Sequence, residues 1–243
     1  MADWVELAER AIRGIAGRGR LPLVVGGTGL YLRALLRGVL PVSRRDAELR
    51  ARLKGILERR GAGRMHRWLR RLDPDSALRV HPADRQRIVR ALELALAGHG
   101  TWSDRIRADG TWSADRERYD TLKIGVDLDR EAHARVLNRR VDRFFEQGLV
   151  AEVRRLLNDG VPRTANAFRA IGYREVLDAI EAGGDPESAR EAVKRSTRRY
   201  AKRQRTWFRT EPDVCWLDAS VDTGRLADRV VALWRNRARS GRP

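Results

Sequence analysis

The sequence predicts an α/β protein in which a parallel sheet carries an inserted all-helical domain. Three short apolar runs, at residues 21–25, 121–126 and 214–217, have the length and composition of buried parallel strands. From residue 46 to about 120 the apolar spacing is that of helices, without a convincing strand. We therefore expect residues 1–43 to begin the α/β core, 44–120 to form the helical insertion, and 121–243 to complete the core with basic C-terminal helices.

The predicted sheet is incomplete. An amphipathic pattern at residues 2–19 leads directly into the first strand, whereas a helix in a doubly wound fold connects two parallel strands. Three strands are also few for a doubly wound sheet in a chain of 243 residues. We therefore expect the first strands of the sheet to be absent from this sequence.

A glycine-rich turn follows the first predicted strand, with Gly26, Gly27 and Gly29 around Thr28. Glycine permits close approach of the backbone to a ligand, and the helix predicted next directs free N–H groups at an anion. The turn lacks the third glycine of a dinucleotide fingerprint and the Gly-Lys-Ser/Thr of a phosphate-binding P-loop. An anion-binding turn is favoured, and a turn without a ligand remains open.

Composition indicates a polyanionic partner. The chain has 51 Lys and Arg against 33 Asp and Glu, which gives a net charge of +18, and its sequence pI is near 11.3. A soluble chain with such an excess of positive charge commonly binds nucleic acid. A generally basic, solvated surface is the alternative.

Other function classes are excluded by composition. No apolar run approaches the roughly 18 residues of a membrane span, and no signal peptide is recognised, so we expect a cytoplasmic protein without a membrane partner. A single cysteine, Cys215, excludes an internal disulfide framework. Four scattered histidines give no metal-ligand spacing, so we expect no protein-held metal.

The helical region is predicted as three helices, at 46–60, 65–72 and 84–97, with Gly61 ending the first and Asp73-Pro74 the second. The sequence Gly-Thr-Trp-Ser occurs at 100–103 and again at 110–113, and we interpret both copies as a polar loop. Trp102 and Trp112 would pack against neighbouring helices, the favoured interpretation, or stack on bases.

The C-terminal part contains a basic helix that begins at Asp185. Val193 and Trp207 lie on one face of this helix. The opposite face carries six cations, Arg195, Arg198, Arg199, Lys202, Arg205 and Arg209. This pattern predicts a packed helix with a cationic stripe, and a merely solvated face is the alternative.

Six separated segments, in the family's order, together resemble the tRNA dimethylallyltransferases, also called tRNA isopentenyltransferases. They are Val-Val-Gly-Gly-Thr-Gly-Leu-Tyr-Leu at 24–32, Asp-Pro at 73–74, Arg-Ile-Val-Arg-Ala-Leu-Glu at 87–93, the region 140–153, Ile-Gly-Tyr-Arg-Glu at 171–175 and Thr-Arg-Arg-Tyr-Ala-Lys-Arg-Gln-Arg-Thr-Trp-Phe-Arg at 197–209. The resemblance extends from residue 2 to about 218.

The resemblance implies transfer of a dimethylallyl group from its diphosphate to N6 of the adenosine on the 3′ side of the anticodon. It implies a P-loop-NTPase-like core with an inserted tRNA-binding domain, and a monomer. The expected partners are dimethylallyl diphosphate, accompanied by Mg²⁺, and a tRNA anticodon stem-loop. Because a stacked adenine is out of reach, the base would be turned out of the stack.

The resemblance also implies site residues. Thr28 and Arg140 would be catalytic, with Arg140 assisting the diphosphate. The diphosphate or substrate pocket would include Gly26, Gly27, Arg198, Lys202, Arg203 and Gln204. The tRNA contacts would be Arg50, then Gln86, Arg87, Ile88, Val89 and Arg90, and the loop of Ala165, Asn166, Ala167, Phe168, Arg169 and Ala170.

The chain departs from the family at two motifs. It contains neither the Gly-Pro-Thr-x-x-Gly-Lys-Ser/Thr P-loop nor the Asp-Ser-x-Gln segment whose aspartate is the expected base. We therefore expect residues 1–243 alone to have little or no transferase activity and marginal stability. A prenyltransferase represented incompletely is favoured over a shortened paralogue that binds RNA without catalysis, and over an enzyme that uses free adenine nucleotide.

Overall fold

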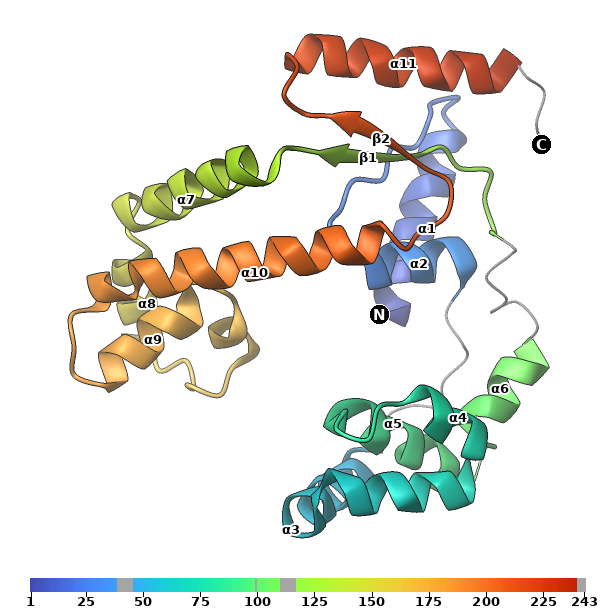
Figure 1. Ribbon diagram of the computed structural model, residues 1–243, viewed down its shortest axis with the longest axis vertical. Helices are drawn as coiled ribbons and strands as arrows, with labels where there is room; N and C mark the ends of the chain where they lie inside the picture. The colour runs from blue at the N-terminus through green and yellow to red at the C-terminus, as the bar shows by residue number, and fades with distance from the viewer. Residues whose placement is uncertain (39–45, 99, 110–116, 240–243) are drawn as a thin grey trace. The chain divides into compact units, whose positions relative to one another are not determined.

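The computed structural model (Figure 1) describes residues 1–38, 46–98, 100–109 and 117–239. The described residues are mostly helical, with one small sheet. The chain divides into two compact units, Met1–Asp120 and Thr121–Pro243. The boundary between the two units coincides with the predicted boundary between 44–120 and 121–243. The division into three parts stays a prediction.

The sheet consists of β1 (Lys123–Asp127) and β2 (Val214–Asp218), which pair in parallel (Figure 1). The register places Asp127 opposite Asp218 at the carboxyl ends of the strands. The second and third predicted strands are thus confirmed. The parallel pairing was part of the same prediction and is also confirmed.

The first predicted strand is wrong. Residues 21–26 have no regular secondary structure, and the side chains expected to be buried are open to solvent, with Leu23 78% and Val25 86% exposed. A strand is stable only when its backbone N–H and C=O groups pair with a neighbour. Among the described residues, β1 and β2 pair only with each other, so this apolar run has no strand to join.

In the first unit, α1 (Ala2–Ala16) packs against α2 (Gly29–Arg37), as predicted for the amphipathic first segment. Val5, Ala34 and Leu35 form the buried contact. The rings of Trp4 and Tyr31 meet edge to face at 5.0 Å between centroids, a favourable aromatic geometry. This packing fixes the start of α2 directly after the glycine-rich turn.

The remaining helices of the first unit are α3 (Ala47–Leu72), α4 (Pro74–Arg79), α5 (Arg85–Leu96) and α6 (Trp102–Asp109). Gly61 has φ 74° inside α3, which breaks the helix at the predicted place. Their apolar core includes Leu53, Leu57, Met65, Leu69, Ile88 and Leu92. The described part of 46–120 therefore contains helices and no strand, as expected.

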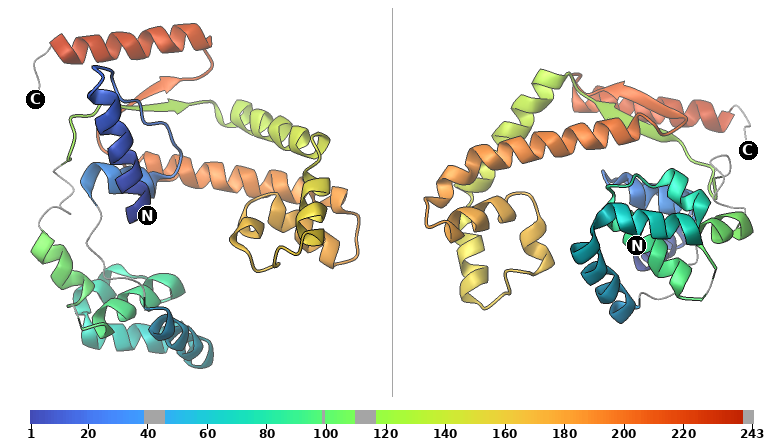
Figure 2. Two further views of the ribbon diagram at one scale, coloured as in Figure 1. Left: turned by 180° about the vertical axis from the view of Figure 1, so that it is seen from behind. Right: turned by 60° about the horizontal axis from the view of Figure 1, so that its bottom comes forward.

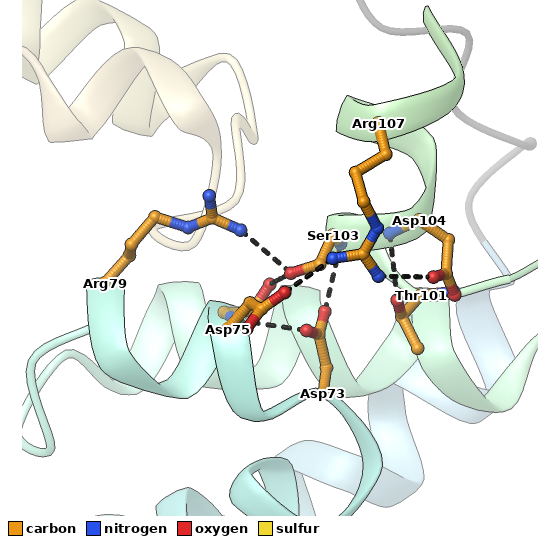
Figure 3. A network of polar contacts seen from close by, with 8 residues as sticks. Asp73, Asp75, Arg79, Thr101, Ser103, Asp104 and Arg107 are labelled. Carbon is orange, nitrogen blue, oxygen red and sulfur yellow. Dashed lines mark hydrogen bonds and ion pairs between the residues drawn. The ribbon is translucent and has the colours of Figure 1, made fainter.

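Two short helices were not predicted. Asp73 ends α3 but also starts α4, because its carboxylate accepts the N–H of Ser76 at 3.0 Å. The same carboxylate accepts the N–H of Ser103 at 3.1 Å, at the start of α6 (Figure 3). The loop prediction for 100–103 was therefore wrong. Trp102 packs against the helical core, which was the favoured interpretation. The second copy of the motif, at 110–113, lies outside the described residues.

The second unit continues from β1 into α7 (Arg130–Glu146) and α8 (Leu149–Asn158), followed by the 3₁₀ turn η1 (Asn166–Arg169) and α9 (Tyr173–Glu181). A second turn, η2 (Pro186–Ala189), leads into the long α10 (Arg190–Phe208), and α11 (Thr223–Arg239) follows β2 (Figure 2). Val141, Val153, Val176 and Val193 are fully buried among these helices.

The backbone conformation of Gly172 shapes the loop before α9. Gly172 has φ 100°, a conformation that favours glycine over residues with a Cβ atom. The carboxylate of Glu175 accepts the N–H of Gly172 at 2.8 Å.

No helix in the described part of the chain is long and apolar enough to cross a membrane.

Candidate functional site

The principal candidate site is an open groove of about 470 Å³ between α7 and α10. We call it the α7/α10 groove. Its apolar lining comes from Ala134, Leu137 and Ala201, and Thr206 adds a hydroxyl group. The remaining lining residues are all basic: Arg130, His133, Arg195, Arg198, Arg199, Lys202, Arg205 and Arg209.

Helical periodicity places these side chains together. The carboxylate of Asp129 accepts the N–H groups of Glu131 at 2.8 Å and Ala132 at 3.0 Å, so α7 begins at Arg130. These backbone hydrogen bonds, from Ala132 first and then Glu131, lower the pKa of Asp129. From that start, Arg130 and His133 project from the same face as the apolar lining residues, because positions three and four apart are neighbours on a helix.

α10 supplies the other wall. Its 19 residues include eight basic residues and a single acidic one, Glu191. Val193 is 1% exposed in the core on one side of the helix, and all six residues of the predicted stripe line the groove on another. The cationic stripe therefore faces a cavity, and is more than a solvated helix face.

Two of the groove cations are paired with a carboxylate. Oδ2 of Asp127 accepts from Nη2 of Arg205 at 2.7 Å and from Nη2 of Arg209 at 3.4 Å. Arg198 is held differently, because its Nη1 donates to the side-chain oxygen of Asn138 at 2.6 Å. These contacts fix three guanidinium groups without neutralising the groove.

Three further groove cations on α10 lack such compensation. Within the described residues, Arg195, Arg199 and Lys202 form no ion pair. Cations one helical turn apart are roughly 5–6 Å apart at Cβ, which is within the Debye length of about 8 Å at physiological ionic strength. Their repulsion is relieved when an anion enters, so the groove is suited to bind phosphate groups.

An ion pair on another side of α10 holds the two walls together. Nζ of Lys194 lies 2.8 Å from Oδ1 of Asp142 on α7, and Arg190 lies 3.5 Å from the same oxygen. The hydrogen bond from Lys194 lowers the pKa of Asp142, and the pKa of Lys194 is raised in return. These residues line no part of the groove and serve to join α7 to α10.

The predicted pocket residues on α10 separate into two groups. Arg198 and Lys202 line the groove, whereas Arg203 and Gln204 do not. The guanidinium of Arg203 lies over the ring of Tyr200, 5.8 Å from its centroid. Arg140, on α7, is exposed and lies over the ring of Phe144 at 5.3 Å, outside the groove lining.

The predicted loop 165–170 contains η1. Phe168 is 2% exposed and belongs to the core of the second unit, so its side chain anchors the loop. The side chains that this loop offers to a partner are those of its exposed members, Asn166, Ala167, Arg169 and Ala170.

In the first unit, Thr28 is the residue before α2, and its carbonyl oxygen accepts the N–H groups of Tyr31 at 3.0 Å and Leu32 at 3.3 Å. Its side chain makes no capping hydrogen bond. Gly26, Gly27 and Thr28 are exposed. The turn therefore presents small, accessible groups at the N-terminus of a helix, as the sequence predicts.

The α5 segment predicted to contact tRNA contains both buried and exposed side chains. Ile88 and Val89 are 0% and 3% exposed and form part of the core, whereas Gln86 and Arg87 are exposed. Arg90 lies 2.8 Å from the buried carboxylate of Glu93.

The remaining predicted contact in this region is Arg50 on α3. Its Nη1 lies 3.2 Å from the same Glu93 carboxylate. Arg87 is the exposed cation of the predicted α5 segment, and its Nε lies 3.4 Å from Oδ2 of Asp84.

Sequence reasoning missed four groove-related residues, Arg130, His133, Asn138 and Asp127. A signal was present, since Arg130 and His133 are three residues apart and therefore share a face of α7. Asp127 directly follows the strand predicted at 121–126, and its contact with α10 depends on tertiary structure. In the described residues no cluster of three His, Cys, Asp or Glu side chains could hold a metal ion.

The chain is similar in sequence to one protein family. The model of the IPP transferase family matches residues 1–211. The tRNA dimethylallyltransferase of Geobacter sulfurreducens is 43% identical over 217 residues, covering 89% of this chain and 69% of the relative. That of Mycobacterium tuberculosis is 40% identical over 245 residues, covering 97% and 76%.

Solved structures are also similar. The full-length tRNA isopentenylpyrophosphate transferase of Bacillus halodurans superposes with a TM-score of 0.66 at 33% identity, covering 98% of this chain and 74% of the other. A eukaryotic dimethylallyltransferase acting on tRNA superposes with a TM-score of 0.75 at 26% identity, covering 99% and 62%. The resemblance stated from the six segments is thus confirmed at the level of the family.

Proposed function

We propose that this chain, which belongs to the IPP transferase family, acts in tRNA modification by dimethylallyl transfer. The donor is dimethylallyl diphosphate, and the acceptor is N6 of the adenosine on the 3′ side of the anticodon. The fold that goes with this proposal is a P-loop-NTPase-like core with an inserted helical domain that binds tRNA. Both substrates are polyanions, which agrees with the net charge of +18.

The α7/α10 groove is the observation that carries the proposal. It is lined by seven arginine or lysine side chains and no carboxylate. An allylic diphosphate ionises readily when the charge developing on its leaving group is stabilised, and fixed cations provide that stabilisation. Arg198 and Lys202 would bind phosphate oxygens there, with Arg195 and Arg199 beside them.

The other predicted roles come from the family resemblance. Thr28 would lie at the active-site turn and Arg140 would assist the diphosphate. Arg87 and Arg169 are exposed cations that could contact the anticodon stem-loop. The acceptor adenosine would be turned out of the stack to reach the donor.

Mg²⁺ is implied as a companion of the diphosphate. Oxygen ligands are what Mg²⁺ prefers, and the residues lining the α7/α10 groove include no carboxylate. The groove therefore does not fit a protein-held Mg²⁺ ion.

We further propose that the 243-residue chain binds the anticodon stem-loop but transfers little or no prenyl group by itself. Neither the P-loop nor the Asp-Ser-x-Gln segment occurs in its sequence. Without the aspartate, the acceptor amine has no identified base, and without the P-loop the diphosphate has only the groove cations.

The test uses the full chain, an anticodon stem-loop RNA, Mg²⁺ and labelled dimethylallyl diphosphate. We expect salt-dependent RNA binding and almost no labelled RNA. Label should appear in the RNA when a polypeptide carrying the two missing family segments is added. Robust transfer by the chain alone would contradict the proposed inactivity.

If the chain neither binds the RNA nor supports transfer after the second polypeptide is added, the proposed function itself is contradicted. A non-catalytic RNA-binding fragment or paralogue is the second candidate, favoured by the absence of the same two segments. It predicts RNA binding with no transfer under either condition. Replacing the stem-loop by free adenine nucleotide tests the acceptor, and we expect no transfer to the nucleotide.

A further inference from the structure

We propose that Asp127 is a positioning residue of the α7/α10 groove, acting through Arg205 and Arg209. Asp127 is the last residue of β1, and its Oδ2 accepts hydrogen bonds from both guanidinium groups. Both arginines line the groove, whereas Asp127 does not. This inference rests on the phosphate-binding role proposed above for the groove.

The carboxylate of Asp127 is itself held in place. Its Oδ1 accepts the backbone N–H of Leu128 at 3.0 Å, which leaves Oδ2 for the two arginines. The side chains of Asp127 and Arg205 are 25% and 28% exposed, whereas that of Arg209 is 60% exposed. Because shielding from water strengthens a charge interaction, the Asp127–Arg205 contact is the stronger of the two.

Holding an arginine before a ligand arrives has a definite advantage. A free arginine side chain loses rotamer freedom when it grips an anion, and prior ordering removes that cost. Each guanidinium has five N–H donors, and Asp127 uses only Nη2 of Arg205 and Nη2 of Arg209. The Nη1 groups of both arginines are left to bind phosphate oxygens, whereas Nε of Arg205 is buried without a hydrogen-bond partner among the residues that the structure describes.

Asp127 also has an opposing effect, because its negative charge lowers the positive potential of the groove. Five other cations, Arg130, Arg195, Arg198, Arg199 and Lys202, line the groove without contact to Asp127. The potential therefore remains strongly positive with Asp127 present. We infer that the gain from ordering Arg205 and Arg209 exceeds the loss of potential.

The two effects predict opposite signs for one variant, which makes the proposal testable. If Asp127 were only a counter-charge, Asp127→Ala would make the groove more positive and tighten anion binding. If Asp127 positions the arginines, the same variant weakens binding although it raises the net charge.

The experiment measures the affinity of the full chain for inorganic pyrophosphate by calorimetry at fixed ionic strength. We expect Asp127→Ala to raise the dissociation constant about fivefold because two ordered side chains become free. Asp127→Asn, which keeps the shape of the side chain, should change affinity in the same direction and decides the matter if the alanine variant does not fold.

Asp218→Asn is the matched control. Asp218 lies opposite Asp127 in the sheet register, and its carboxylate accepts the N–H and hydroxyl groups of Ser220 at 2.8 Å each. This variant removes the same charge from the same end of the sheet without touching a groove arginine. Its affinity for pyrophosphate should be unchanged or slightly higher.

A double-mutant cycle separates positioning from general loss of structure. Once Arg205→Ala has removed the principal contact, adding Asp127→Ala should weaken binding by much less than it does in the unmodified chain. If the effects of Arg205→Ala and Asp127→Ala on pyrophosphate binding were fully additive, the positioning role of Asp127 would be overturned. Tighter or unchanged binding in both Asp127 variants would also overturn this role, but not the phosphate-binding role of the groove. Absence of pyrophosphate binding in the unmodified chain would overturn the phosphate-binding role of the groove as well.

Discussion

Gly125 leaves room for the ring of Trp216 on the neighbouring strand. The two residues are opposite each other in the register of β1 and β2. A Cβ atom at position 125 would lie 2.6 Å from Cε3 of the indole ring, well inside contact distance. The glycine therefore allows a large aromatic side chain to cover a sheet of only two strands.

We expect Gly125→Ala to destabilise the second unit by about 1–3 kcal/mol, the usual cost of overpacking. Urea unfolding followed by tryptophan fluorescence measures the change. Gly63→Ala is the control, because position 63 is helical and a Cβ there has no neighbour within 4 Å. This control should be neutral or stabilising by up to about 1 kcal/mol, and equal destabilisation by both variants would contradict the packing argument.

At the level of single residues, burial and caps were the most predictable features. Val193 was expected inside, and it is. Asp129 stands directly before a periodic segment, a position typical of a helix cap, and it caps α7. The pairing of Asp127 with Arg205 could not be predicted, because it joins residues 78 positions apart and local patterns carry no such information.

At the level of elements, most helices and two strands followed from periodicity, whereas α4 and α6 did not. Asp73 was interpreted only as a stop, yet one side chain can end one helix and cap the next. The Thr-x-x-Asp pattern at Thr101 and Asp104 is a helix-start signature. The apolar run at 21–25 failed because strand formation depends on a pairing partner as well as on composition.

The start of α6 gives a pH-dependent prediction. The carboxylate of Asp104 accepts two hydrogen bonds from Thr101. The hydroxyl of Thr101 donates at 2.7 Å and the backbone N–H of Thr101 donates at 2.9 Å. These bonds, with a further one from Arg107, lower the pKa of Asp104 from 3.8 to about 2. Because the folded-state pKa is the lower one, this cap contributes fully above about pH 4 and is lost as the pH falls towards 2.

Nuclear magnetic resonance can follow the amide of Thr101 and the carboxyl of Asp104 from pH 5 to pH 1.5. We expect a common midpoint near pH 2, as the pKa of Asp104 indicates. Thr101→Val removes the hydroxyl donor and should move the midpoint up towards 3.8. A midpoint already near 3.8 in the unmodified chain would show that the cap does not form.

At the level of the whole molecule, the charge of +18 was the clearest indication of a polyanionic partner. Composition could not say where the charge gathers. The stripe on α10 was predictable from spacing, but the groove also needs α7, and the packing of α7 against α10 was not encoded in any local pattern. Family resemblance supplied the reaction, which neither charge nor periodicity could specify.

The salt dependence of RNA binding tests whether the groove is where this charge acts. Each phosphate contact with single-stranded RNA contributes roughly −0.7 to the slope of log affinity against log salt concentration. Arg199→Gln removes a groove cation without an ion pair among the described residues, and should flatten the slope by about 0.7. Arg225→Gln is the control, since Arg225 is exposed on α11 and lines no part of the groove. It makes the same change in net charge, so equal slopes for the two variants would mean that RNA responds to total charge and not to the groove.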